Sequence, residues 1–140
     1  LDLPFKSRKD KIASLQIDIS RVRELKVSYL RDYYDSHFEN NMEKEVTSFL
    51  NKFPYMRTYA CFKILYDKYN GKPWETWQEN QYTIELENKI INENLSEFNF
   101  QIWLQIISYT QLKEIKELYT KEGIFLKGDM PILTSRNSAD

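Results

Sequence analysis

The stretch SEFNFQIWLQIISYTQLKEIKELYTKEGIFL, residues 96–126, decides the fold. Its apolar residues recur every three or four positions, which predicts one helix over residues 97–121. At ~1.5 Å per residue, this helix is about 40 Å long. Ser96 is the expected N-cap, and Gly123 is expected to end the helix. Residues 124–126 form a short apolar run, which favours a buried parallel strand, and such a strand needs a partner sheet.

The preceding residues continue the helical pattern. Their apolar spacing predicts further helices over residues 19–38, 42–53, 54–69 and 80–93. Asn70 and Gly71 are expected to end the third of these with a left-handed cap. Residues 1–12 are polar and basic after Phe5 and are interpreted as a loop or an incoming linker. Only three glycines and four prolines interrupt the chain, which favours long helices. The expected fold class is therefore mainly α, with one strand near the end.

Composition and charge argue against several classes of protein. Twenty basic and twenty-one acidic residues leave a net charge of −1, which does not suggest a nucleic-acid binder. No apolar run approaches the ~20 residues that span a bilayer, and the first residues do not form a signal peptide. A single cysteine (Cys61) and a single histidine (His37) argue against a disulfide framework and against a zinc site. We therefore expect a cytoplasmic location. Since the chain opens with Leu1 in place of Met, we expect an internal piece of a longer protein.

The clearest chemical signal is the string GIFLKGDMPI, residues 123–132, followed by NSAD at 137–140. It places an acidic residue, Asp129, at the carboxyl end of the expected strand. In barrel enzymes the carboxyl ends of the strands are where substrate is bound. A carboxylate there can hold a sugar hydroxyl or orient a catalytic group. On spacing alone, the favoured interpretation of Asp129 is a turn cap.

These residues resemble the first shared motif of the amylomaltase and disproportionating enzyme family of 4-alpha-glucanotransferases. Upstream, YACFKIL at 59–65 and GKPWETW at 71–77 resemble two further motifs of the family. Gln105 and Gln111 match a pair of glutamines at the same spacing. The matches occur in the family's order and cover about residues 45–140. Lys127, Arg136 and Asn137 look more like the cytosolic plant-type subgroup and its bacterial relatives.

The resemblance implies a retaining transglycosylase that transfers glucosyl or maltooligosyl units between α-1,4-glucans. Such enzymes use two carboxylates about 5 Å apart, one as nucleophile and one as acid/base. In the family both lie beyond the position of Asp140, so no catalytic residue is expected in this chain. The resemblance implies substrate binding by Asp129, with Ser138 and Asp140 in the adjoining loop. It implies an α-1,4-glucan or maltooligosaccharide as binding partner, and no metal or organic cofactor.

The same resemblance implies how the chain is organised. Residues 1–122 are expected to form a helical subdomain within or beside a (β/α)8 TIM barrel. Residues 123–140 are expected to supply one barrel strand and the start of an active-site loop. The alternative is a non-enzymatic helical interaction domain whose aromatic face binds a partner. The glucanotransferase hypothesis also predicts exposed apolar surface on the chain by itself, while the sequence is silent on the oligomeric state.

Several residues have a structural interpretation beside a functional one. The aromatic stripe over residues 55–69 can stack on sugars, but its helical spacing favours a core position. Trp74 and Trp77 can face a glucan, although packing against the long helix is favoured. Gln111 is expected to be a buried, hydrogen-bonded amide. His37 follows Asp35 and Ser36, yet a solvated helix end is favoured over a catalytic trio because neighbours on a helix point in different directions.

Overall fold

The first of two units in the chain consists, where it is described, of one helix. The computed structural model describes residues 18–37, 42–129, 135, 138 and 139, and divides into units Leu1–Phe38 and Glu39–Asp140. Helix α2 spans Ile19–His37. Asp18 Oδ1 accepts the backbone N–H of Arg21 at 3.0 Å, which satisfies one of the donors at the start of the helix. His37 Nδ1 donates to the carbonyl oxygen of Tyr33 at 2.9 Å, and the two rings stack. His37 therefore occupies a helix end, as predicted.

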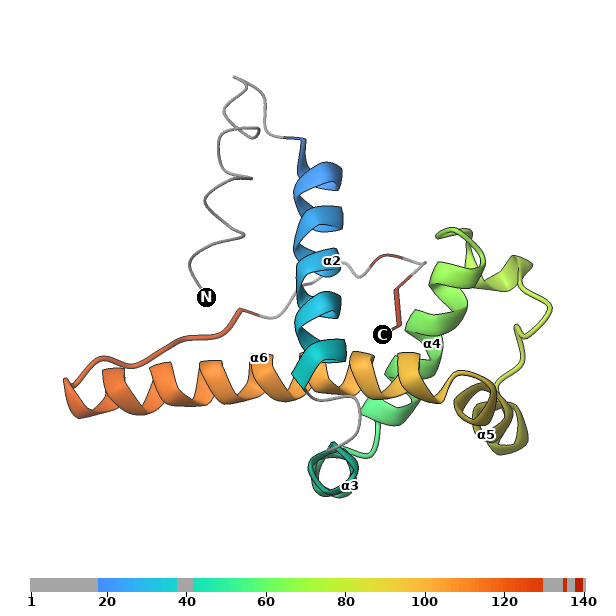
Figure 1. Ribbon diagram of the computed structural model, residues 1–140. Helices are drawn as coiled ribbons and strands as arrows, with labels where there is room; N and C mark the ends of the chain where they lie inside the picture. The colour runs from blue at the N-terminus through green and yellow to red at the C-terminus, as the bar shows by residue number, and fades with distance from the viewer. Residues whose placement is uncertain (1–17, 38–41, 130–134, 136–137, 140) are drawn as a thin grey trace. The chain divides into compact units, whose positions relative to one another are not determined.

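The second unit is built around its longest helix. Its elements are α3 (Glu43–Lys52), α4 (Met56–Lys68), the 3-10 helix η1 (Trp74–Thr76), α5 (Ile84–Glu93) and α6 (Leu95–Lys121). Helix α6 contacts α3, α4 and α5, and α4 also contacts α5 (Figure 1). The part of the chain that the structure describes contains helices and no strand. The prediction of a mainly helical chain is confirmed.

Backbone chemistry explains where the helices of this unit end. Asn70 and Gly71 have φ of 52° and 72°, and the Gly71 N–H donates to the Tyr66 carbonyl oxygen at 2.8 Å. This is the predicted left-handed cap after α4. The prediction that Ser96 caps the long helix is wrong, because α6 begins at Leu95. Only Asn94 separates α5 from α6, so Ser96 is already the second residue of α6 and cannot be its N-cap.

The most deeply buried large side chains of this unit lie in the first half of α6. Phe100, Ile102 and Trp103 each expose 2% of their surface or less. Beyond Tyr109 every residue of the helix is exposed, because the packed helices cover only its first half. The predicted buried amide at Gln111 is therefore wrong. The buried glutamine is instead Gln101, whose Nε2 donates to a Glu97 carboxylate oxygen of the same helix at 2.8 Å.

The aromatic stripe of α4 is not the buried face of that helix, so the prediction of a core position is wrong. Tyr55 is 64% exposed, and the remaining aromatic side chains of the stripe are only half-buried. The buried positions of α4 carry smaller side chains: Ala60, Cys61, Ile64 and Leu65. The distance between packed helices depends on the side chains at their contact, and these smaller groups allow a close approach. Among the rings, Phe62 and Tyr69 instead pack on Trp77.

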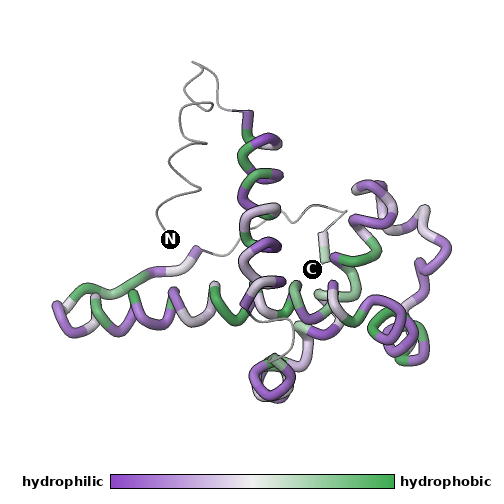
Figure 2. Tube along the Cα trace, in the orientation of Figure 1, coloured by the Kyte–Doolittle hydropathy of each residue, from purple (hydrophilic) through white to green (hydrophobic). Residues whose placement is uncertain are grey.

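The segment after α6 is extended but unpaired. Gly123 has a φ of 73°, and the next N–H donates to the carbonyl oxygen of Tyr119 at 2.8 Å, so the predicted helix end is confirmed. Residues 124–126 follow, with exposed fractions of 53%, 80% and 47%. Figure 2 shows apolar residues both at the end of α6 and in this segment. A strand requires a neighbour for its backbone groups, and the described residues offer none. The barrel strand stays a prediction.

Candidate functional site

A cavity of about 310 Å³ opens within the second unit, between α4, the segment after it and α5. This volume lies at the lower end of the ~300–1,000 Å³ range of small-molecule sites, so it suits a single ring. Its lining is largely apolar and aromatic, with a few polar groups. The helices and the intervening segment contribute Phe62 and Leu65, Trp74 and Tyr82, and Leu86 and Ile90.

The aromatic wall of the cavity is held in place by Trp77, which is 4% exposed. Its indole Nε1 donates to the carbonyl oxygen of Lys72 at 2.9 Å. Its ring stacks on Tyr69, with centroids 5.5 Å apart and planes 9° apart, and it lies 5.4 Å from the ring of Phe62. Trp77 thus packs on Phe62 of α4 and on Tyr69 just after that helix. Its packing against the long helix, favoured from the sequence, stays a prediction. Trp74 remains 38% exposed at the cavity.

Glu79 places a carboxylate on the lining of the cavity. Lys68 Nζ donates to one carboxylate oxygen at 2.7 Å, and the Tyr69 hydroxyl donates to the other at 2.5 Å. The hydrogen bond from Lys68, followed by that from Tyr69, lowers the pKa of Glu79 below its usual range. The pKa of Lys68 is raised for the same reason. The group is therefore an ionised and oriented acceptor at neutral pH.

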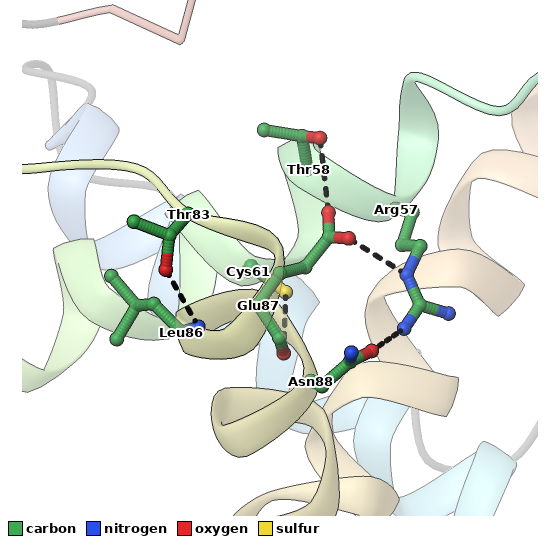
Figure 3. Close-up of polar contacts among 7 residues, drawn as sticks. All are labelled: Arg57, Thr58, Cys61, Thr83, Leu86, Glu87 and Asn88. Carbon is green, nitrogen blue, oxygen red and sulfur yellow. Dashed lines mark hydrogen bonds and ion pairs between the residues drawn. The ribbon is translucent and has the colours of Figure 1, made fainter.

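A second carboxylate on the lining of the cavity is buried and accepts two side-chain hydrogen bonds (Figure 3). Glu87 on α5 is 5% exposed, and its carboxylate accepts from Arg57 Nε at 2.8 Å and from the Thr58 hydroxyl at 3.0 Å. Arg57 also donates from Nη2 to Asn88 Oδ1 at 2.6 Å. This network joins α4 to α5 and fixes the two helical walls. Sequence reasoning missed it, although Glu87 stands three and four residues before the buried Ile90 and Ile91, on the same helical face.

The single cysteine lies in the floor of the same cavity. Cys61 is buried, and its thiol lies 3.9 Å from the backbone carbonyl oxygen of Glu87, to which it donates a weak hydrogen bond. Burial, reinforced by the negative charge of Glu87, raises the pKa of the Cys61 thiol to about 12. A protonated, buried thiol is a poor nucleophile, so Cys61 is a structural residue.

The predicted substrate-binding residues fall in different places. Asp129 is exposed and is not part of the cavity lining. Ser138 and Ala139 do line the cavity, and the Ser138 N–H donates to the carbonyl oxygen of Ser135 at 2.9 Å. Asp140 lies outside the described residues. The cavity itself was not predicted, although two of its aromatic residues belong to the GKPWETW string quoted above.

The described residues hold neither a cluster of metal ligands nor a helix suited to a membrane. Within residues 18–37, 42–129, 135, 138 and 139, no three His, Cys, Asp or Glu side chains lie close enough together to bind a metal ion. None of the helices in that same part of the chain combines the length and the apolar character needed to cross a membrane.

The fold is a helical module with a cavity lined largely by apolar and aromatic side chains. The family model described as 4-alpha-glucanotransferase matches residues 3–140, so the chain belongs to the 4-alpha-glucanotransferase family. This confirms the family resemblance and counts against a module unrelated to glucan enzymes.

Curated relatives carry the same name. The chain is 28% identical over 127 residues to a 4-alpha-glucanotransferase of Chlamydia pneumoniae, covering 89% of this chain and 24% of that protein. It is 26% identical over 121 residues to one of Aquifex aeolicus, covering 84% and 25%. It is 30% identical over 90 residues to "4-alpha-glucanotransferase DPE2" of rice, Oryza sativa subsp. japonica, covering 61% and 10%. The chain spans about a quarter of the length of the bacterial relatives. No solved structure matches it with significance.

Proposed function

We propose that this chain is part of a 4-alpha-glucanotransferase that moves glucosyl or maltooligosyl units between α-1,4-glucans with retention of configuration. The observation that carries the proposal is the family match over residues 3–140. The names of the relatives and the motif at residues 123–132 support it. A helical interaction domain without activity explains neither the match nor the motif.

The proposed mechanism divides the work between this chain and the rest of the catalytic domain. Retaining transfer needs a nucleophile and an acid/base about 5 Å apart, and both are assigned to parts of the relatives' length that this chain does not span. In this chain Asp129 is assigned to a sugar hydroxyl near the reacting bond, with Ser138 and Asp140 in the adjoining loop. The exposed position of Asp129 keeps its carboxylate available for such a contact. No metal or organic cofactor enters this scheme.

We also propose that residues 124–126 become one strand of a (β/α)8 barrel, with residues 1–122 as a helical subdomain beside it. Support comes from Phe125, an apolar residue that is 80% exposed in the chain by itself. Apolar runs of this length are typical of strands buried on both faces of a parallel sheet. A cytoplasmic location is proposed as well, because the single cysteine gives no sign of a disulfide framework.

The proposal is tested by glucose release from maltotriose, measured on the complete protein and on its Asp129→Ala variant. We expect transfer activity in the parent and a loss of about tenfold or more in the variant, equivalent to ~1.4 kcal/mol of transition-state binding. Asp67→Ala is the matched control, since this exposed aspartate makes only a 3.9 Å ion pair with Lys63. The 140-residue chain alone is expected to be inactive. A folded parent without transfer activity refutes the proposed function.

A further inference from the structure

We propose that the cavity between α4 and α5 binds one glucosyl unit of an α-1,4-glucan, with Trp74 and Tyr82 supplying the stacking faces. The identity of the ligand rests on the proposed function, whereas the presence of a binding site rests on the geometry. Neither the family match nor the names of the relatives assigns these residues.

Two large aromatic rings on the lining of the cavity are exposed. Trp74 is 38% exposed and Tyr82 is 59% exposed, and both line the cavity. Large exposed rings gathered around a concave surface mark a binding site more often than scattered surface residues do. The C–H faces of a pyranose ring are apolar, and they pack on aromatic faces in the same way as other flat apolar groups.

Polar groups that can bind hydroxyls lie on the same lining as those rings. The lining includes the carboxylate of Glu79 and the amide of Asn80. Asn80 Nδ2 donates to the carbonyl oxygen of Glu75 at 3.2 Å, which orients the amide. Glu79 is already oriented by two donors and carries a negative charge, so it can still accept from a hydroxyl. A ligand with apolar faces and hydroxyl edges satisfies both kinds of surface, whereas a purely apolar ligand leaves the polar groups unmatched.

Hydrogen bonds and ring stacking hold the lining of the cavity in place without a ligand. Trp77 is fixed by its hydrogen bond to Lys72 and its stacking on Tyr69. The bonds from Arg57 and Thr58 to the buried Glu87 fix α4 against α5. A site that is already ordered loses little conformational freedom on binding, which permits measurable affinity for a small ligand.

The test is a titration of the 140-residue chain with maltotriose, followed by tryptophan fluorescence and by amide NMR shifts of residues 58–90. We expect saturable binding with a Kd in the range of about 1 mM, with the shifts confined to the cavity. Trp74→Ala should weaken binding by about fivefold to tenfold or more, because it removes one stacking face. Tyr119→Ala is the matched control: this ring is 39% exposed, close to the 38% of Trp74, but lies on α6 and does not line the cavity. It should leave the Kd unchanged.

Tyr82→Ala provides a second variant in case Trp74→Ala perturbs the fold, and it should weaken binding in the same direction. The proposal is overturned if maltotriose produces no saturable change, or if the Kd is the same in the parent, in Trp74→Ala and in Tyr82→Ala. It is also overturned if an apolar dye binds the cavity and maltotriose does not displace it. Transfer activity of the complete protein is read separately. An active enzyme whose cavity binds no sugar refutes this inference alone, and an inactive enzyme whose cavity binds sugar refutes only the transfer function.

Discussion

Replacing Arg57 by methionine should expose how much of the fold depends on the buried carboxylate of Glu87. The methionine keeps the apolar stem of the side chain but removes the guanidinium that donates to Glu87 at 2.8 Å. The Glu87 side chain is 6% exposed, so water cannot fully replace the lost donor. The Thr58 hydroxyl would then be its one remaining side-chain donor in the network of Figure 3.

The expected cost is about 2–3 kcal/mol of unfolding free energy. Removing one partner of a fully buried ion pair costs ~3–5 kcal/mol, and leaving a buried acceptor unsatisfied costs ~1–3 kcal/mol. Arg57 is 39% exposed, so the lower part of the combined range applies. The accompanying loss of its bond to Asn88 adds little, because that contact is exposed.

Urea unfolding followed by far-UV circular dichroism at neutral pH measures this cost. Arg21→Met is the matched control, because Arg21 pairs with Glu24 at 3.2 Å on the surface, with side chains 66% and 68% exposed. That variant should cost less than ~0.5 kcal/mol. The double variant Arg57→Met/Glu87→Met should recover at least half of the loss, since it removes the unpaired charge together with its partner. A loss below ~0.5 kcal/mol in Arg57→Met, equal to the control, would refute the reasoning.

Four further outcomes are expected. Cys61, with its pKa raised to about 12, should react with a disulfide reagent at least about a hundredfold more slowly in the native chain than in urea; equal rates would contradict its burial. Thr83→Ala should cost about 1 kcal/mol in urea unfolding, because the Thr83 hydroxyl accepts the Leu86 N–H at 3.1 Å, and Thr83→Ser should restore most of it. Ile102→Ala, at a fully buried position, should cost ~2–5 kcal/mol, whereas Ala in place of the 45% exposed Ile115 on the same helix should cost far less; similar losses would refute the burial argument. The lowered pKa of Glu79 stabilises the fold above the ordinary value of 4.5, and that contribution is lost as the pH falls through the lower folded value, so Glu79→Gln should flatten stability between neutral and acid pH.

The positions of the helices could be predicted from the sequence, because periodicity and backbone chemistry are local properties. The long helix was expected over residues 97–121 and spans Leu95–Lys121. Asn70 and Gly71 identified the end of α4, since few residues other than these adopt a positive φ. Ser96 is an exception. Its side chain suits an N-cap, but α5 ends at Glu93 and α6 begins at Leu95, so Ser96 already lies inside the helix.

Burial was harder to predict from the sequence, because it depends on which neighbouring helix covers a given face. The apolar stripe of α6 continues through Ile115 and Leu118, but the covering helices stop near Tyr109. In α4 the periodicity favoured burial of its rings, although Ala60 and its small neighbours form the face that is buried. The packing against α6 selected the smaller face.

Long-range polar contacts were the least accessible part of the candidate site. The bonds from Arg57 and Thr58 to Glu87 cross about thirty positions of sequence. No local pattern contains such a pairing. The motif residues Trp74 and Trp77 could be found from the sequence, but not their different exposure.

The two halves of α6 should differ in how their backbone amides exchange with solvent. Isolated helices shorter than ~12–15 residues are marginal in water, because the first turn is costly to nucleate. Residues 110–121 are all exposed in the described part of the chain, so they gain little packing to offset that cost and depend on the buried turns around Trp103. Amide protection should therefore decline steadily along the helix, from near the global unfolding limit at Trp103 to almost none at Lys121. The exposed half of α6 would then form only by extension of the buried half.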